Sequence, residues 1–252
     1  MTDPKTDVHT AMPALQGKRI VVTGGTTGIG RAIALLLASE GARLFVFGRE
    51  PEPLADTLAA IKAVGGEGHG VTADVAKPED VERVFARADE ALGGLDILIN
   101  NAAIWGEALA EMDEWRYSVD TNFTGFLDTA RQGAKRLVAR GDGHIVLIGS
   151  VSAIHRSAGS SVYVAAKSGI QGFAQSFRKE LASSGVRVTL IEPGLVGSDL
   201  LDSSPEEQVE QINAKKMLRA EDIAVGVHYA LTQPTRCNVV AMQIEPLLQE
   251  QD

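Results

Sequence analysis

The stretch Arg19-Ile-Val-Val-Thr-Gly-Gly-Thr-Thr-Gly-Ile-Gly-Arg31 decides the fold of this chain. Its residues 20–22 form a β-branched apolar run, which is typical of a strand buried on both faces. A glycine-rich turn follows, and residues 32–40 then favour a helix with one apolar stripe. A glycine turn alone also suits a simple tight turn, but its place between a buried strand and a helix predicts the first unit of a dinucleotide-binding fold. In such a unit the backbone approaches a pyrophosphate, whose charge the helix N-terminus favours.

Strand-like runs alternate with helical stretches along the rest of the chain. Strands are expected near residues 19–23, 43–47, 68–72, 95–99, 143–149, 186–191 and 238–243. The alternation predicts an α/β fold of the Rossmann type, a doubly wound, seven-stranded parallel sheet with helices on both faces. A chain of 252 residues with 44% hydrophobic content can bury one full core. Residues 17–252 are therefore expected to form a single dinucleotide-binding catalytic domain, and the polar residues 1–16 a flexible N-terminal tail.

A second pattern lies downstream, where Tyr163 and Lys167 stand one helical turn apart and follow Ser150. A phenol with a pKa of about 10 exchanges protons poorly at neutral pH, and a neighbouring ammonium lowers that pKa. A reduction of roughly three units, about 4 kcal/mol, brings Tyr163 near the working pH of a general acid. Ser150 is then a hydrogen-bond donor to the oxygen on which charge develops. Taken by itself, a Tyr-x-x-x-Lys pair also suits a helix surface.

Several motifs, in a fixed order, carry a resemblance to a known family. They are Thr-Gly-x-x-x-Gly-x-Gly at residues 23–30, Asn-Asn-Ala-Ala at residues 100–103, Asn122 within Thr-Asn-Phe-Thr-Gly, the set Ser150, Tyr163 and Lys167, and Pro193-Gly194 after a predicted strand. From about residue 18 to its end, the chain resembles the short-chain dehydrogenase/reductase family. It resembles the compact single-domain branch, near NADP-dependent 3-hydroxy acid dehydrogenases and carbonyl reductases. It departs from the family pattern at Ala103, where glycine is usual, and lacks the common Asp-Gly-Gly ending.

The resemblance implies a catalytic set of Asn122, Ser150, Tyr163 and Lys167. In that set Tyr163 passes a proton to or from the substrate oxygen while a hydride moves between a nicotinamide and the carbon. Lys167 also bonds the nicotinamide ribose, and Asn122 holds a water that connects Lys167 to solvent. For Asn122 the alternative is a helix-interior residue that bonds neighbouring backbone.

The end of the second predicted strand bears on the cofactor. An acidic residue there would bond an adenosine ribose and repel a 2′-phosphate, but this chain has Gly48 followed by Arg49. A guanidinium can clamp that phosphate, so NADP is expected, with NAD and a merely solvated Arg49 as the alternatives. The glycine turn has Thr27 where many NADP-dependent relatives carry a second basic residue. The expected cofactor contacts are Gly24, Thr26, Thr27, Gly28, Ile29, Gly30, Arg49, Asp74, Val75, Asn101, Ala102, Tyr163, Lys167, Pro193, Gly194, Val196 and Ser198.

Loops near the expected cleft carry mainly apolar side chains, which suits an apolar ketone or secondary alcohol. The expected substrate contacts are Trp105, Ser152, Ile154, Leu195 and Leu200. His155 and Arg156 offer an alternative, because they could bind a carboxylate and make the substrate a hydroxy acid or a semialdehyde; they could also be exposed loop residues. The polar stretch 203–216 is expected to form a mobile helical lid.

Composition excludes several other functions. A net charge of −9 argues against nucleic acid as a partner. No apolar run is long enough to span a bilayer, and the polar first sixteen residues lack the apolar central region expected of a signal peptide. The five histidines are scattered without metal-ligand spacing, so no metal is expected. The single cysteine, Cys237, permits no intrachain disulfide, and a cytoplasmic location is expected.

The resemblance implies an NADP(H)-preferring oxidoreductase that interconverts a ketone or aldehyde and an alcohol, as a carbonyl reductase or alcohol dehydrogenase does. A 3-hydroxy acid or semialdehyde dehydrogenase is the alternative. An isomerase or epimerase would need a larger C-terminal lobe, a dehydratase or lyase would not need the Ser–Tyr–Lys set, and a non-catalytic NADP sensor would tend to lose it. The family also implies a homotetramer or homodimer, with the expected helices 112–138 and 161–184 at the main contact.

Overall fold

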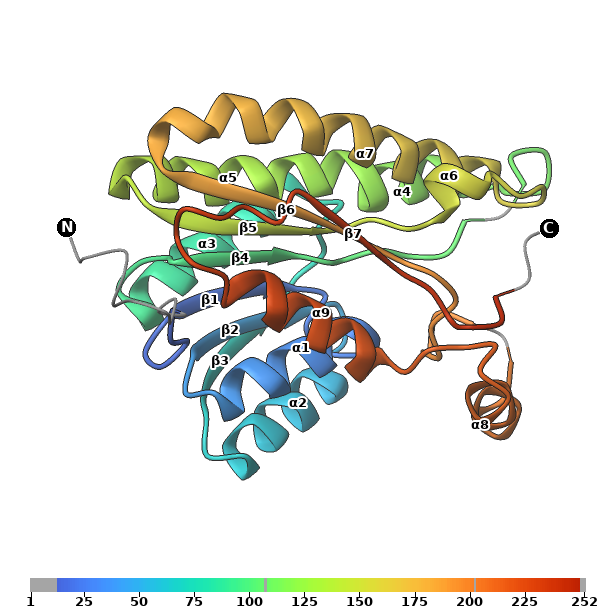
Figure 1. Cartoon of the computed structure of the whole chain (residues 1–252), viewed down its shortest axis with the longest axis horizontal. Coiled ribbons are helices and arrows are strands. Elements are labelled where there is room, and N and C mark those ends of the chain that lie inside the picture. The colour runs from blue at the N-terminus through green and yellow to red at the C-terminus, as the bar shows by residue number, and fades with distance from the viewer. Residues whose placement is uncertain (1–12, 107, 202, 250–252) are drawn as a thin grey trace, which may run out of the picture.

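The computed structural model of the chain describes residues 13–106, 108–201 and 203–249 and has one parallel sheet (Figure 1). The spatial order is β3-β2-β1-β4-β5-β6-β7. The strands are β1 (Arg19–Thr23), β2 (Arg43–Gly48), β3 (Glu67–Thr72), β4 (Ile97–Asn100), β5 (Gly143–Ile148), β6 (Val186–Pro193) and β7 (Ala241–Ile244). This topology confirms the predicted fold class. Three strand starts differ from the predicted ones. β3 begins one residue earlier, at Glu67, and β4 begins two residues later, at Ile97, where its pairing with β1 starts. β7 begins at Ala241, after a turn in which the Cys237 N–H donates to the Pro234 carbonyl.

Helices cover both faces of the sheet (Figure 1). On one face lie α1 (Gly28–Ser39), α2 (Pro51–Ala63) and α9 (Ala220–Leu231), and on the other lie α3 (Pro78–Leu92), α5 (Gly125–Arg140) and α7 (Ser161–Leu181). Shorter helices are α4 (Trp115–Val119), α6 (Ser152–His155) and α8 (Pro205–Asn213), the last within the expected lid. None of the helices in the described part of the chain is long and apolar enough to cross a membrane.

Each of the two long helices that the sequence predicts contains a turn that is not α-helical. The first begins at Trp115, and a π turn, η1 (Asp120–Thr124), separates α4 from α5. In that turn the Gly125 N–H donates to the Asp120 carbonyl, five residues back. The second helix ends at Leu181 and passes into the 3₁₀ turn η2 (Ala182–Ser184). Single π turns inside helices are frequent at functional sites.

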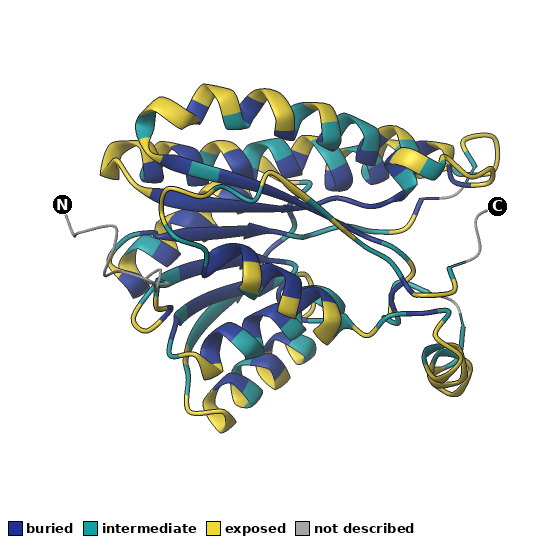
Figure 2. Ribbon diagram, in the orientation of Figure 1, coloured by how far each residue is buried: buried dark blue, intermediate teal, exposed yellow. Residues whose placement is uncertain are grey.

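Two apolar layers, one on each side of the sheet, form the core (Figure 2). Because both faces are covered, the central strands are buried along their whole length, as the runs in β1 and β5 predict. Leu15 belongs to the layer under α1 and is 4% exposed, although it lies in the segment expected to be a loose tail. Residues 1–12 of that segment lie outside the described residues.

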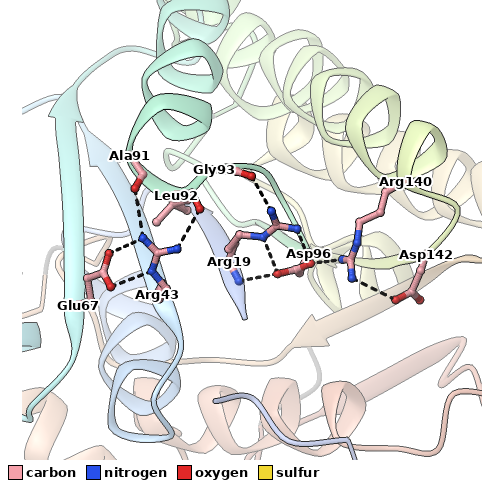
Figure 3. Close-up of polar contacts among 9 residues, drawn as sticks. All are labelled: Arg19, Arg43, Glu67, Ala91, Leu92, Gly93, Asp96, Arg140 and Asp142. Carbon is pink, nitrogen blue, oxygen red and sulfur yellow. Dashed lines mark hydrogen bonds and ion pairs between the residues drawn. The ribbon is translucent and has the colours of Figure 1, made fainter. Parts of the chain in front are cut away.

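Two groups of ion pairs lie at the amino-terminal ends of the strands, one linking β1 with β4 and the other β2 with β3 (Figure 3). The Arg19 guanidinium donates to both carboxylate oxygens of Asp96 at 2.9 Å, and Arg140 pairs with the same carboxylate. Burial by itself raises the pKa of Asp96, but the bonds from Arg19 and the charge of Arg140 outweigh burial and hold the pKa below its ordinary value. Arg43 donates two bonds of 2.8 Å to Glu67, and these bonds, with a further one from His69, lower the pKa of that carboxyl to about 2. The functional site lies at the other ends of these strands, their carboxyl-terminal ends.

Candidate active site

The glycine turn lies at the carboxyl edge of the sheet, between β1 and β4, where the strand order reverses. Gly24 has φ +59, and a Cβ there would lie 2.9 Å from the Ala102 Cα. A Cβ on Gly30 would overlap the Gly24 carbonyl oxygen. Asn101 donates its amide to that same oxygen at 3.1 Å and so holds the turn in place. The exposed backbone N–H groups of such a turn at a helix N-terminus suit a pyrophosphate.

The end of β2 cannot accept a side chain at the position where an acidic residue would bind a ribose. A Cβ on Gly48 would overlap the Thr26 hydroxyl, so glycine is required by close packing against the glycine turn. Arg49 follows at the rim of the cleft and is exposed. Arg49 thus places a cation at this end of the cleft, beside the carboxylates of Glu50 and Asp74.

The three groups expected to carry chemistry come together at the ends of β5 and α7. Ser150 follows β5, and its hydroxyl is within hydrogen-bonding reach of the Tyr163 phenol, which α7 supplies. Lys167 lies one turn further along α7, is 2% exposed, and donates to the Ile148 carbonyl at 3.1 Å. The Trp105 ring lies 5.1 Å from the Tyr163 ring, centroid to centroid, and covers it from the side. All four side chains face one cleft.

The charge state of this pair differs from the sequence prediction. Burial raises the pKa of Tyr163 to about 12, and the hydrogen bond with Ser150 offsets only part of that rise. The prediction that the Tyr163 pKa is lowered by Lys167 is wrong for the protein without cofactor, because burial disfavours the charged form of both side chains. Burial lowers the pKa of Lys167 to about 8, and its Nζ lies 5.4 Å from the Tyr163 ring centroid while it bonds a backbone carbonyl. At pH 7 the phenol is protonated and the amine is mostly charged.

Asn122 lies in the π turn and is fully buried. Its side chain accepts from the Ile104 N–H at 2.8 Å and donates to the Ile104 carbonyl at 2.9 Å. A further bond runs to the Ser118 hydroxyl at 3.2 Å. Asn122 is not one of the residues that line the cleft, so its side chain fixes the loop after β4 rather than facing the substrate. The backbone that Asn122 bonds is eighteen residues away in the chain, so these bonds differ from the local helix bonds of the alternative reading.

The cleft has a volume of about 970 Å³, which is at the upper end for a small-molecule site and leaves room for a dinucleotide and a substrate. Most of the residues expected at a cofactor or substrate do line it: Gly24, Thr26, Thr27, Gly28, Ile29, Arg49, Asp74, Val75, Asn101, Ala102, Trp105, Ser150, Ser152, Tyr163, Lys167, Pro193, Gly194, Leu195, Val196, Ser198 and Leu200. Gly30 instead packs behind the turn.

Three residues expected near the substrate point elsewhere. Ile154 is 42% exposed and does not line the cleft, because the short helix α6 turns its side chain outward. His155 and Arg156 are also absent from the cleft wall. His155 faces Glu245 at 3.5 Å, and the Arg156 side chain folds back onto the Ala153 carbonyl. The sequence could not predict these directions, since they depend on where α6 ends.

Thr121 and Gln249 are among the cleft residues that the sequence analysis missed. Thr121 is buried, and its hydroxyl has no hydrogen-bond partner among the residues that the structure describes. Gln249 comes from the C-terminal segment, and its side-chain oxygen accepts from the Leu195 N–H at 3.0 Å. In the sequence, the only feature that pointed to Thr121 as a site residue was its place next to Asn122. No feature pointed to Gln249. In the described part of the chain, no group of three or more His, Cys, Asp or Glu side chains is placed to hold a metal ion.

A doubly wound parallel sheet with a glycine turn at its switch point, and a buried Ser–Tyr–Lys set beside it, defines a Rossmann-type nucleotide-dependent enzyme. The family model for short chain dehydrogenases matches residues 18–209. An uncharacterized oxidoreductase from Staphylococcus aureus (strain MRSA252) is 36% identical over 94% of this chain and 100% of its own length. The chain therefore belongs to the short-chain dehydrogenase/reductase family and is an oxidoreductase of that type.

Solved structures agree with this assignment. A short chain dehydrogenase from Burkholderia cenocepacia J2315, in complex with NADP, superposes with a TM-score of 0.83. It is 32% identical, and the match covers 93% of this chain and 98% of the other. A variant of actinorhodin polyketide ketoreductase, solved with NADPH, has a TM-score of 0.82 at 32% identity, over 91% of this chain and 96% of the other.

Proposed function

We propose that this protein is an NADP(H)-dependent oxidoreductase that interconverts a ketone or aldehyde and the corresponding alcohol. The observation that carries the proposal is the burial of Ser150, Tyr163 and Lys167 at one end of a cleft whose other end is the glycine turn. The cofactor, when bound, supplies the hydride for reduction or accepts it in oxidation. The chain's own residues bind the reactants, orient them and move the proton.

Tyr163 is the proton donor in the reduction direction. With a pKa of about 12 its phenol carries a proton at neutral pH, so it can transfer that proton to the substrate oxygen as a hydride reaches the carbonyl carbon. The products are the alcohol and a tyrosinate that must be reprotonated. Ser150 donates a hydrogen bond to the same oxygen. Lys167, with a pKa of about 8, is mostly charged at pH 7 and would bond the nicotinamide ribose. Asn122 acts by holding the loop at Ile104.

NADP(H) is the preferred cofactor for two structural reasons. Gly48 cannot be replaced by an acidic residue without a clash with Thr26, and Arg49 stands at the rim to receive a 2′-phosphate. The relatives solved with NADP and with NADPH support the same choice. The glycine cradle at Gly24, Gly28 and Gly30 fits a pyrophosphate, because the backbone is left bare there. A Cβ on Gly24 or Gly30 would crowd the turn, and a Cβ on Gly28 would lie 3.3 Å from the Ser198 and Asp199 side chains.

The substrate is a mainly apolar carbonyl compound. Trp105, Leu195 and Leu200 are apolar residues of the cleft lining, and the Trp105 ring lies beside the Tyr163 ring. Ser152 lies beside Ser150, with 3.0 Å between their hydroxyl oxygens. The hydroxy acid alternative loses its structural basis at His155 and Arg156, since neither lines the cleft. Keto acids therefore serve as the comparison class in the assay.

We further propose a cytoplasmic homodimer or homotetramer. An apolar groove between α5 and α7, lined by Leu127, Ala134, Val138, Phe173 and Phe177, lies on the helices expected at the main contact. A reducing compartment suits the single, exposed Cys237. Light scattering coupled to gel filtration measures the assembly, and a monomer at working concentration would contradict it.

The function is tested by following nicotinamide absorbance with NADPH or NADH against ketones, aldehydes and keto acids. We expect turnover with NADPH and an apolar ketone, and a Tyr163→Phe loss of about a hundredfold or more in kcat with NADPH binding retained. Tyr229→Phe, at an exposed position on α9, is the matched control and should keep full activity. Unchanged turnover in Tyr163→Phe would overturn the mechanism, and preference for NADH would overturn the cofactor assignment.

A further inference from the structure

Tyr117 on α4 joins two residues that line the adenosine end of the cleft. Its phenol donates to the Asp74 carboxylate at 2.9 Å. The same oxygen accepts from the Arg49 guanidinium at 3.0 Å. Arg49 follows β2 and Asp74 follows β3, so one side chain from α4 links the ends of two strands. Tyr117 itself is not among the residues that line the cleft.

The position of the phenol is set from the Asp74 side. One Asp74 carboxylate oxygen accepts from the Ala76 N–H at 3.0 Å, and the Asp74 N–H donates to Asp80 at 2.9 Å. The other carboxylate oxygen receives the phenol proton. With its only proton committed to Asp74, the phenol can offer Arg49 nothing but a lone pair, in a defined direction. The three groups therefore have one mutually satisfied arrangement.

Arg49 needs such a partner because it is exposed and its side chain is long. An arginine that is free to rotate loses rotamer entropy each time it clamps a phosphate, and a guanidinium held in advance loses less. The phenol also stands between the guanidinium and the Asp74 carboxylate. Without it, the cation could pair with that carboxylate directly, and the donors used in that pair would be lost to a phosphate.

We propose that Tyr117 is a positioning residue for NADP recognition, which holds Arg49 ready for the 2′-phosphate and keeps it apart from Asp74. This inference rests on the proposed function, in which Arg49 receives that phosphate. Tyr117 acts through Arg49 and does not touch the cofactor. Asp74 keeps its bond from the Ala76 N–H without the phenol, so we expect the effect mainly on ligands that carry the 2′-phosphate.

The test is calorimetric binding of two fragments at fixed salt: adenosine 2′,5′-bisphosphate, which carries the 2′-phosphate, and 5′-AMP, which lacks it. We expect Tyr117→Phe to weaken the bisphosphate about fivefold, the scale of one ordinary hydrogen bond, and to leave 5′-AMP within about twofold. Arg49→Gln should weaken the bisphosphate more, by about thirtyfold. In the Arg49→Gln background, the further change Tyr117→Phe should have an effect below about twofold. In turnover, Tyr117→Phe should raise the KM for NADPH and leave kcat unchanged.

The outcomes separate this inference from the proposed function. If Arg49→Gln does not discriminate the two fragments, the assignment of Arg49 to the 2′-phosphate fails, and the inference fails with it. If Arg49→Gln discriminates and Tyr117→Phe does not, only the inference is overturned. Equal weakening of both fragments by Tyr117→Phe, or an undiminished effect in the Arg49→Gln background, would also overturn it, because Tyr117 would then act on the whole subsite. Retained 5′-AMP binding reports that each variant is folded, and Tyr229→Phe is the matched control.

Discussion

His144 should make the stability of this protein fall in mild acid. It lies on β5 and is 1% exposed. Its Nε2 is 2.8 Å from the Thr189 hydroxyl on β6, while its Nδ1 has no hydrogen-bond partner among the described residues. A second proton on the ring would therefore be buried without an acceptor. Burial, with a smaller contribution from the nearby charge of Arg187, lowers the pKa of His144 from 6.5 to about 3.

The size of the effect follows from linkage. The folded-state pKa lies below the unfolded value, so the unfolded chain takes up the proton first, and the free energy of unfolding falls as the pH drops below 6.5. At about 1.4 kcal/mol per unit, the loss from this group is about 2 kcal/mol by pH 5 and approaches about 5 kcal/mol near pH 3. Above pH 6.5 His144 is neutral in both the folded and the unfolded chain, so it causes no loss in the free energy of unfolding.

The assay is chemical denaturation at pH 7.5 and pH 5 at one protein concentration, for the natural chain and for His144→Gln. Glutamine can still reach the Thr189 hydroxyl but does not titrate in this range. We expect the variant to lose about 2 kcal/mol less than the natural chain between the two pH values. Carboxylates such as Asp96 are present in both proteins and cancel in the difference. An identical pH dependence in the two proteins would refute the reasoning. His69→Gln is the control, because that side chain is 42% exposed.

Two further predictions concern the two ends of the strands, Gly30 at their carboxyl ends and Asp96 at their amino ends. Gly30→Ala should weaken NADPH binding about tenfold or more and destabilise the fold by about 1–3 kcal/mol, because its Cβ would overlap the Gly24 carbonyl. The control is Gly172→Ala, a helical position with open space around it, which should stabilise the fold by about 0.5–1 kcal/mol. Denaturation and calorimetry measure both, and normal cofactor binding by Gly30→Ala would contradict the cradle. Asp96→Asn should lower the free energy of unfolding by about 2–4 kcal/mol, since two guanidinium groups lose their carboxylate, and should leave cofactor affinity unchanged. Asp142→Asn, at an exposed pair of 3.7 Å, should cost less than about 1 kcal/mol, and equal losses in the two variants would refute the ranking.

The parts of the candidate site that consist of residues close together in the sequence could be predicted. Tyr163 and Lys167 share a helix face because of the helical period, and the glycine turn follows β1 because only small residues let the backbone come so close. Local sequence says nothing about solvent exclusion, however. For that reason the direction of the Tyr163 pKa shift was predicted wrongly: the pair is buried under Trp105 and the loop after β4, and burial outweighs the neighbouring charge.

The sequence by itself determined the seven-stranded parallel sheet, its helices on both faces, and the edge at which the glycine turn and the Ser–Tyr–Lys set meet. Periodicity and motif order carry that information, because strands and helices are local structures and parallel strands share their carboxyl ends. Only the tertiary structure decided which way Ile154, His155 and Arg156 point, that Gln249 enters the cleft, and that Tyr117 stands between Arg49 and Asp74. These contacts join segments far apart in the chain, and no local preference specifies them, because packing selects one geometry only once the whole core has formed.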